Sequence, residues 1–483
     1  MKKDIMWGKM IMKKFVTIVT IMVMISAGPF STTITTALKT DSIKGFHLAY
    51  KNALFDITDI GSFGQAAWGV ATADFNQDGN LDFAAAYADK PITHSEISIF
   101  YGDGTGNFTK KDIWSIHEIY INNLNAGDYN NDGYTDILIC YTEHDQSGGN
   151  TNGTIGILLN DGENNFTTYT RILTLPGRTN PHTTTADFNN DGLLDFVVGD
   201  NGGKAELYLN NGDLNFTGTG FIHDWGDVSW GVASGDVDRD GDVDLLIAAC
   251  TSYPQGGVYL IKNQWQESNH TIIFNQDPGV LVFSLPWQAF TASLTSIDYN
   301  HDGAPDFIIG AGYQLYLLLN KNSEFIPYLF CMLTNKGGFT GEDFTSGGMA
   351  SGDFNHDGYD DLATGGTQGI VRLFLNKQTL AVITYPRSGY VYKFGEEGMS
   401  TIYVTILIGK INVSILTLSN VSKIEVYANL LLLGTLRTPP YNLTWKWTPQ
   451  LMFIHVWSLR IIAYSYDGNR TSYDSIFPTV RIL

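Results

Sequence analysis

The chain has 483 residues, too many for one ordinary domain, although an array of repeats can exceed the usual domain size. Charged residues make up 16%, against a typical ~25%, whereas 51 glycines and 13% aromatic residues are typical of a turn-rich all-β protein. The formal net charge of −20 argues against nucleic acid as a partner, because phosphate contacts need Lys and Arg.

The N-terminus has the layout of a secretory signal peptide. Lysines precede an apolar run from Phe15 to Ala27, small residues follow, and Pro29 would end a helix. The run is short for a membrane span, so residues 1–37 are predicted to be a signal peptide with a short linker, or alternatively an uncleaved N-terminal anchor. No second span is predicted, because His455 and Arg460 interrupt the apolar stretch near residues 451–464. The protein is therefore expected to be secreted, in the extracellular space or on the cell surface, and to meet a membrane only through that anchor.

Six acidic loops follow, and all share the pattern D-x-[DN]-x-D-G-x-x-D. Side-chain oxygens at alternate positions can turn inward around Ca²⁺, which takes about six to eight oxygen ligands, and the glycine lets the backbone turn. Asn/Asp/Gly clusters also occur in ordinary turns, but six copies in one register favour metal loops. The predicted side-chain ligands are Asp74, Asn76, Asp78, Asp82; Asp128, Asn130, Asp132, Asp136; Asp187, Asn189, Asp191, Asp195; Asp236, Asp238, Asp240, Asp244; Asp298, Asn300, Asp302, Asp306; and Asp353, Asn355, Asp357, Asp361.

An EF-hand loop begins in the same way, but it needs a bidentate Glu at its twelfth position and a helix on both sides. None of the six loops has an acidic residue at that position, which is held by Ala85, Ile139, Val198, Ile247, Ile309 and Thr364. The segments after the loops are short, apolar and often β-branched, which predicts buried strands. Each loop is therefore expected to join two strands.

The first aspartates of successive loops are 54, 59, 49, 62 and 55 residues apart. Each period holds four predicted strands, which is typical of a propeller blade. The last repeat lacks a fourth strand after residues 369–378, and the segment 53–61 is a fourth strand with nothing before it, so their pairing would close the ring. A six-bladed β-propeller is expected over residues 46–378, with seven blades as the alternative if a degenerate unit lies in the 62-residue gap.

These loops and the apolar strands after them resemble FG-GAP and VCBS repeats, which build integrin α-subunit propellers and several secreted lectin-like propellers. The resemblance covers about residues 46–378 and implies about six structural Ca²⁺ ions. It also implies that the seventh residue of each loop supplies a backbone carbonyl to the metal. Those carbonyl donors would be Asn80, Tyr134, Leu193, Asp242, Ala304 and Tyr359.

From about residue 380 the acidic loops stop, and short alternating strands are separated by Pro, Gly and Asn turns. About seven such strands in residues 380–483 predict a small β-sandwich. The order P-x-x-G, V-x-x-I-E-V-Y, P-Y-N-L-T-W and A-Y-S-Y-D-G-N resembles bacterial immunoglobulin-like domains, which commonly act as spacers or adhesion modules.

The expected function is that of a secreted or cell-surface binding or adhesion protein for a glycan or a surface protein, with a monomeric propeller. A polysaccharide lyase or hydrolase, or its accessory module, is the alternative, but no catalytic motif was found and the acidic loops account for most carboxylates. The loops opposite the calcium loops are expected to hold the ligand, although Trp68 and Trp230 would alternatively pack between blades. The candidate ligand residues are Trp68, His182, Trp230, Tyr253 and Trp287.

Overall fold

A computed structural model describes part of the chain, and the fold below refers to that part only. The described residues are 54–63, 66–88, 94–117, 119–144, 149–252, 255–265, 274, 279–285, 292–312, 314–332, 348–366, 369–385, 390–393, 396–400, 405–408, 411–419, 421–428, 431–445, 459–466, 471–476 and 479–482. The predicted signal peptide or anchor, residues 1–37, lies outside them. Within these ranges there is no helix with the length and hydropathy that a membrane span requires.

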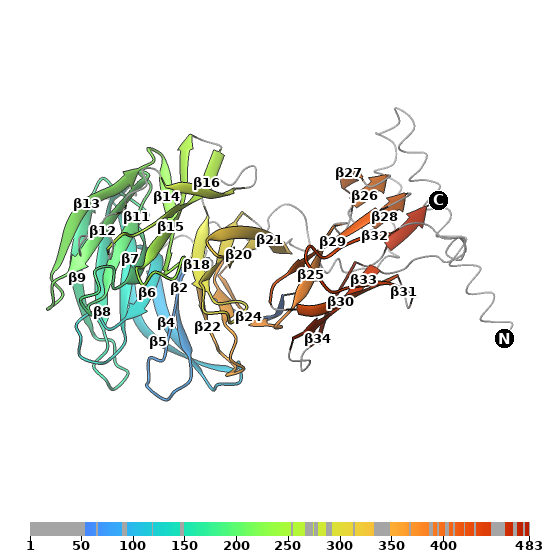
Figure 1. The fold of residues 1–483 in the computed structure, drawn as a ribbon. Coiled ribbons are helices and arrows are strands. Elements are labelled where there is room, and N and C mark those ends of the chain that lie inside the picture. The colour runs from blue at the N-terminus through green and yellow to red at the C-terminus, as the bar shows by residue number, and fades with distance from the viewer. Residues whose placement is uncertain are drawn as a thin grey trace, which may run out of the picture. The chain divides into compact units, whose positions relative to one another are not determined.

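Six sheets of four antiparallel strands occupy the described residues between 55 and 376 (Figure 1). Five consist of consecutive strands: β2 (Ala66–Ala73), β3 (Asp82–Ala88), β4 (His94–Gly102), β5 (Phe108–His117); β6 (Tyr120–Gly127), β7 (Asp136–His144), β8 (Asn150–Leu159), β9 (Thr168–Pro176); β10 (His182–Ala186), β11 (Asp195–Gly199), β12 (Lys204–Asn210), β13 (Phe216–Asp224); β14 (Val228–Gly235), β15 (Asp244–Ser252), β16 (Gln255–Ile261), β17 (Val280–Ser284); and β18 (Ser293–Ile297), β19 (Asp306–Ala311), β20 (Gln314–Lys321), β21 (Glu324–Met332). The sixth combines β22 (Met349–Gly352), β23 (Asp361–Thr364) and β24 (Ile370–Asn376) with β1 (Phe55–Ser62).

The second strand of each sheet is the apolar run that the sequence predicts after each acidic loop. In β3, β11, β19 and β23 every residue is buried. The ninth residue of each loop begins this strand and lies opposite the last residue of the first strand, as Asp82 lies opposite Ala73. Strands, not helices, flank the loops, so the EF-hand alternative is excluded by the structure.

Neighbouring sheets pack face to face around a closed sequence of contacts. The first strands contact one another in the order β2, β6, β10, β14, β18 and β22, and β22 returns to β2. Each pair of neighbouring sheets encloses its own apolar cluster; for example, Ile97 and Ile99 of one sheet pack with Ile137 and Ile139 of the next. In Figure 1, β9 and β13 lie at the outer edge of the array and β2 and β6 lie inside it. This arrangement is consistent with a β-propeller.

The pairing of β1 with β24 joins the two ends of the repeat array, as the sequence predicts. The strands run antiparallel, with Phe55 opposite Asn376 and Ser62 opposite Ile370. Phe55 is 1% exposed and packs against Tyr299, Phe330 and Phe374, with ring centroids 5.5, 5.1 and 6.1 Å away. The N-terminal strand therefore completes both a sheet and a core.

A buried asparagine at or just after the end of the third strand connects five of the six sheets to the sheet before them. The side-chain Nδ2 of Asn320, for example, donates to the carbonyl of Val237 in the loop of the preceding sheet, at 2.8 Å. The same bond is made by Asn160 to Phe75, Asn210 to Tyr129, Asn263 to Phe188 and Asn376 to Tyr299. Gly102 occupies this position in the first repeat, where a Cβ would lie 2.3 Å from the carbonyl oxygen of Leu81. Five of the six interfaces among the described residues thus carry the asparagine bond, and the interface between the sixth and first sheets does not.

The residues after the repeats form eleven described strands in three sheets. These are β25 (Ala381–Tyr385), β29 (Ile411–Thr417), β32 (Asn442–Trp445); β31 (Leu431–Leu436), β30 (Val421–Ala428), β33 (Leu459–Ser465), β34 (Thr471–Ile476); and β27 (Glu396–Ser400), β26 (Tyr390–Lys393), β28 (Thr405–Ile408), β35 (Thr479–Ile482). The first two sheets share one apolar core, which includes Val413, Ile424 and Ile461. The third contains the parallel pairs β26–β28 and β28–β35, which the prediction of about seven strands did not include.

Candidate calcium loops and a pocket at the opposite end of the sheets

The six acidic loops share one backbone conformation. The fourth residue of each loop has a positive φ, between 53° at Asn190 and 63° at Arg239. The glycine at the sixth position follows with φ between 79° and 95°, a region that side chains disfavour, which explains why every loop has glycine there. The register of the motif is therefore set by backbone geometry as well as by its carboxylates.

The first aspartate of each loop binds the backbone of its own turn. In the third loop, Asp187 Oδ1 accepts from the N–H of Asp191 at 3.0 Å, and Oδ2 accepts from the N–H of Gly192 at 2.8 Å. The fifth-position aspartate in turn accepts from the N–H of the seventh residue, as Asp191 does from Leu193 at 2.9 Å. The same bonds recur in the other five loops. They hold the first and fifth carboxylates against the backbone of one turn.

The ninth-position aspartate is buried and connects the loop to the rest of its sheet. Asp136, for example, accepts through Oδ2 from the N–H of Tyr129 at 3.2 Å and through Oδ1 from the N–H of Asn160 at 2.9 Å. Burial raises the pKa of these carboxyls, and the neighbouring loop aspartates raise it further, while the backbone donors oppose the shift. The pKa is about 6 at Asp82, about 7 at Asp136, Asp195, Asp244 and Asp361, and about 8 at Asp306.

The fourth loop shows most directly that these residues fit a cation. Asp236, Asp238 and Asp244 each place one carboxylate oxygen within 4.8 Å of the others. Oδ1 of Asp238 is buried and has no hydrogen-bond partner among the described residues, whereas its Oδ2 accepts from Lys262 Nζ at 2.5 Å. A buried carboxylate oxygen without a donor is costly unless a cation binds it. Calcium would be held here by oxygen ligands of the type that it prefers.

Asp240→Ala is expected to remove one calcium ion per chain and leave the other loops loaded. Asp240 is the fifth-position ligand of the only loop predicted to have four aspartate ligands, and its Oδ1 also accepts from the N–H of Asp242. Metal analysis of the folded variant measures the stoichiometry, and Glu163→Gln, at an exposed hairpin residue, is the matched control. An unchanged calcium content in Asp240→Ala would show that the loop has been misread.

Three of the predicted ligand residues come together at the other end of the sheets. Trp68 is in β2, His182 begins β10, and Trp230 is in β14, each near the start of a first strand whose far end leads into an acidic loop. The sequence predicts these residues on loops, but in the structure they lie on strands. Tyr253 and Trp287 lie outside the described residues.

These residues line a pocket of about 160 Å³ to which four successive sheets contribute. Trp68 packs on Tyr120 with ring centroids 4.8 Å apart, and His182 stacks on Trp230 at 6.2 Å and 15°. The two tryptophans thus pack between sheets and also line a cavity. Packing between blades, the alternative given for them above, is therefore compatible with a place in a ligand site. The pocket residues are Trp68, Tyr120, Asn122, Thr142, His144, Asn150, Asn180, His182 and Trp230.

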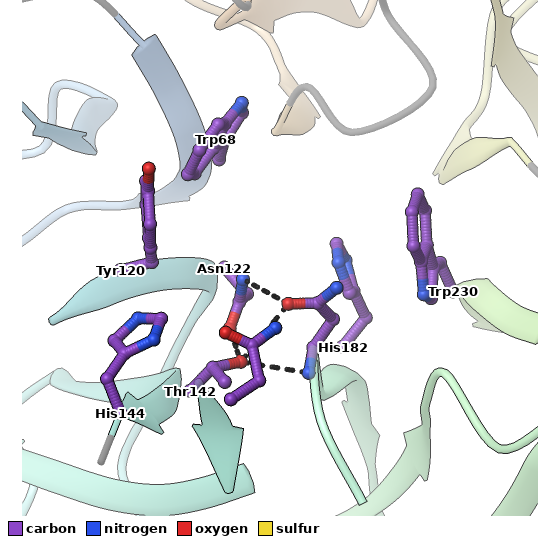
Figure 2. Close-up of a pocket in the computed structure, with 9 residues that line it drawn as sticks. Trp68, Tyr120, Asn122, Thr142, His144, His182 and Trp230 are labelled. Carbon is purple, nitrogen blue, oxygen red and sulfur yellow. Dashed lines mark hydrogen bonds between the residues drawn. The ribbon is translucent and has the colours of Figure 1, made fainter. Parts of the chain in front are cut away.

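A small polar network lies between the two aromatic pairs (Figure 2). Thr142 Oγ1 lies 2.9 Å from Asn122 Oδ1 and 3.1 Å from Asn180 Oδ1, and it accepts from the backbone N–H of Asn180 at 2.9 Å. Asn122 Nδ2 donates to Asn180 Oδ1 at 3.3 Å. Burial lowers the pKa of His182 to about 4, so its imidazole is neutral at pH 7.

Sequence reasoning missed six of the pocket residues: Tyr120, Asn122, Thr142, His144, Asn150 and Asn180. The sequence contained one signal for Asn122, which lies six residues before the first aspartate of its loop. Trp68 and Trp230 occupy the same position relative to their own loops. Thr142, His144 and Asn150 carry no such repeat signature.

Comparison with known families identifies the repeats. A model described as FG-GAP-like repeat matches residues 74–139 and 187–247, and a model described as FG-GAP repeat matches residues 347–392. The chain therefore contains FG-GAP-type repeats, and the matched stretches include the first four loops and the sixth. No curated protein matches the chain.

Two solved structures illustrate the wider likeness. One is BBS1N in complex with ARL6DN, soaked with mercury: it is 9% identical, with a TM-score of 0.38, over 66% of this chain and 95% of that chain. The other is an Agrocybe aegerita lectin that recognises non-reducing terminal N-acetylglucosamine: it is 15% identical, with a TM-score of 0.37, over 79% of this chain and 86% of that chain. Likeness at these TM-scores has no bearing on function.

Proposed function

We propose that this protein is a secreted or cell-surface six-bladed β-propeller, stabilised by about six calcium ions, that binds an extracellular partner through the end of the ring opposite its acidic loops. The propeller would act as a monomer and would bind its ligand without converting it. The observation that carries the proposal is the pocket in which Trp68, His182 and Trp230, from three different sheets, come together.

The role of calcium rests on the repeats and on the loops. FG-GAP repeats often bind calcium, and each loop holds its first and fifth carboxylates on one side of a turn. The fourth loop adds a buried carboxylate oxygen without a donor. In every loop the ligands would be the side chains predicted above, together with the carbonyl of the seventh residue. The bound ion would neutralise the clustered carboxylates. It would also hold together the first and second strands of the sheet, which the loop joins.

The pocket has the composition of a binding site. Aromatic side chains give large contact areas at small conformational cost, and a few convergent polar groups provide orientation. The acidic loops stand at the opposite ends of the same strands, so a ligand in the pocket would leave the metal loops undisturbed. The C-terminal strands would form an immunoglobulin-like sandwich that serves as a spacer or an adhesion module; the apolar core shared by two of their sheets supports a sandwich.

The proposal is tested with the purified mature protein, loaded with calcium, on a panel of polysaccharides, oligosaccharides and cell-surface proteins. Binding without turnover of any bound polysaccharide is the expected result. Release of reducing ends or of unsaturated products would instead support the alternative, a secreted polysaccharide lyase or hydrolase. Failure to bind any member of the panel would contradict the proposed function.

A further inference from the structure

The charge, the polar groups, the aromatic side chains and the volume of the pocket indicate the kind of ligand that it would bind. We infer that it holds one uncharged saccharide ring, with the aromatic side chains against the faces of the ring and the Asn122–Thr142–Asn180 network against its hydroxyl groups. This inference rests on the proposed binding function and adds to it the chemical class of the ligand.

The charge of the pocket favours an uncharged ligand. None of the nine described residues that line it is Asp, Glu, Lys or Arg. The imidazole of His182 is neutral, because burial lowers its pKa. A carboxylate, phosphate or sulfate group would lose part of its hydration here and gain no opposite charge from these residues, which is unfavourable. Acidic sugars and phosphorylated ligands are therefore disfavoured.

The polar groups of the pocket have unused hydrogen-bonding capacity. Asn180 Oδ1 accepts within the network, but among the described residues its Nδ2 has no acceptor. Asn122 Nδ2 uses one of its two N–H groups. Nε1 of Trp68 and Nε2 of His144 are buried and have no partner among the described residues. Buried polar groups are normally paired, so these groups are suited to a ligand that carries several hydroxyls.

The aromatic groups select for the flat, C–H-bearing faces of a sugar. The Trp68–Tyr120 and His182–Trp230 pairs come from four different sheets and line one cavity. A methylated ammonium ion also binds aromatic faces, but it has no donors or acceptors for the Asn122 and Asn180 amides. The amide groups therefore favour a saccharide over a cation.

The volume of the pocket is suited to one sugar ring. About 160 Å³ is close to the roughly 150 Å³ of a cavity that holds benzene and well below the roughly 300 Å³ at which drug-sized ligand sites begin. A longer glycan would have to place its other sugars outside the pocket. For a ligand of this size the expected Kd is on the order of 1 mM, which a multivalent glycan surface would strengthen.

The experiment measures binding of glucose, galactose, mannose and N-acetylglucosamine to the calcium-loaded protein by ligand-observed NMR and tryptophan fluorescence. Glucuronic acid, glucose 6-phosphate and choline are the charged comparisons. Trp230→Ala and Trp68→Ala are each expected to weaken binding by at least tenfold, while Trp230→Phe retains part of it. Trp114→Ala is the matched control, because Trp114 also stacks on a tyrosine, Tyr169, but lies outside the pocket. Circular dichroism and calcium content show whether each variant is folded.

The outcomes distinguish a failure of the inference from a failure of the proposed function. Binding of a neutral monosaccharide that is lost in the two alanine variants and kept in Trp114→Ala supports the inference. Glycan or surface-protein binding that survives both alanine variants overturns the inference and leaves the proposed function standing. Preferential binding of choline or of the charged sugars overturns the assigned ligand class. Should the folded protein bind no saccharide and no surface protein, the proposed function fails together with the inference.

Discussion

Removal of bound metal is expected to lower the melting temperature of the protein by on the order of 10–20 °C. A ligand that binds only the folded state stabilises it by about 2.7 kcal/mol per site at a concentration 100 times its Kd. Six loops of the same construction are present, and 1 kcal/mol corresponds to about 2 °C or less in a protein of this size. Without the ions, the carboxylates that the loop backbone holds together would repel one another, and neighbouring sheets would loosen.

Differential scanning calorimetry with and without a chelator measures this effect. Re-addition of calcium is the positive control and should restore the melting temperature. Magnesium should restore little of it, because this ion resists an all-protein set of ligands. A melting temperature that stays constant in protein shown to be metal-free would mean that the loops are ordinary turns.

Phe55→Ala is expected to lower the free energy of unfolding by about 3–5 kcal/mol. Phe55 is 1% exposed and is surrounded by three aromatic rings, so its removal leaves a large cavity in the core that joins the fifth and sixth sheets. The residue lies on the only strand of its sheet that comes from the N-terminal end of the repeat array. Its loss should therefore weaken the closure of the ring.

Ile57→Ala provides a control on the same strand. Ile57 is 39% exposed and lies opposite Phe374 in the ladder, so its backbone pairing is retained and little apolar surface is lost. Urea unfolding of both variants should show a change below about 1 kcal/mol for Ile57→Ala. Equal effects of the two substitutions would contradict the role given to Phe55.

The sheets of the repeat array were largely predictable, because the sequence pattern that specifies each loop and the strand after it is short and is repeated. The pattern from Asp74 to Asp82 fixes a turn and the start of a buried strand, and six copies of it indicate six sheets of one kind. The pairing of β1 with β24 followed from a missing fourth strand at one end and an extra one at the other. The third C-terminal sheet was not predicted, because its parallel pairs join segments as distant as Thr405 and Thr479.

The pocket was predictable only in part, because it is assembled from residues that are not repeated. Trp68 and Trp230 stand out at one position of two repeats, whereas the same position in the second repeat holds Asn122, a residue also common in turns. Thr142 and Asn180 are 38 residues apart, and they meet only when the connection between β9 and β10 folds back onto β7. Their role depends on tertiary contacts that no local pattern encodes.

Gly102 leaves the first sheet without the asparagine bond that joins each of the other five sheets to the sheet before it, and the neighbour affected is the sixth sheet. That sheet is also the one held together by a non-covalent junction between the two ends of the array, through β1 and β24. The interface between the sixth and first sheets keeps other bonds, such as Thr72 Oγ1 to the carbonyl of Ser351, but with the asparagine bond missing we expect local opening of the ring to start there. The four sheets that line the pocket would meanwhile stay joined through Asn160, Asn210 and Asn263. One wall of the pocket nevertheless borders this interface, because Trp68 lies on β2 and β2 contacts β22 of the sixth sheet, so opening there would reach the ligand site.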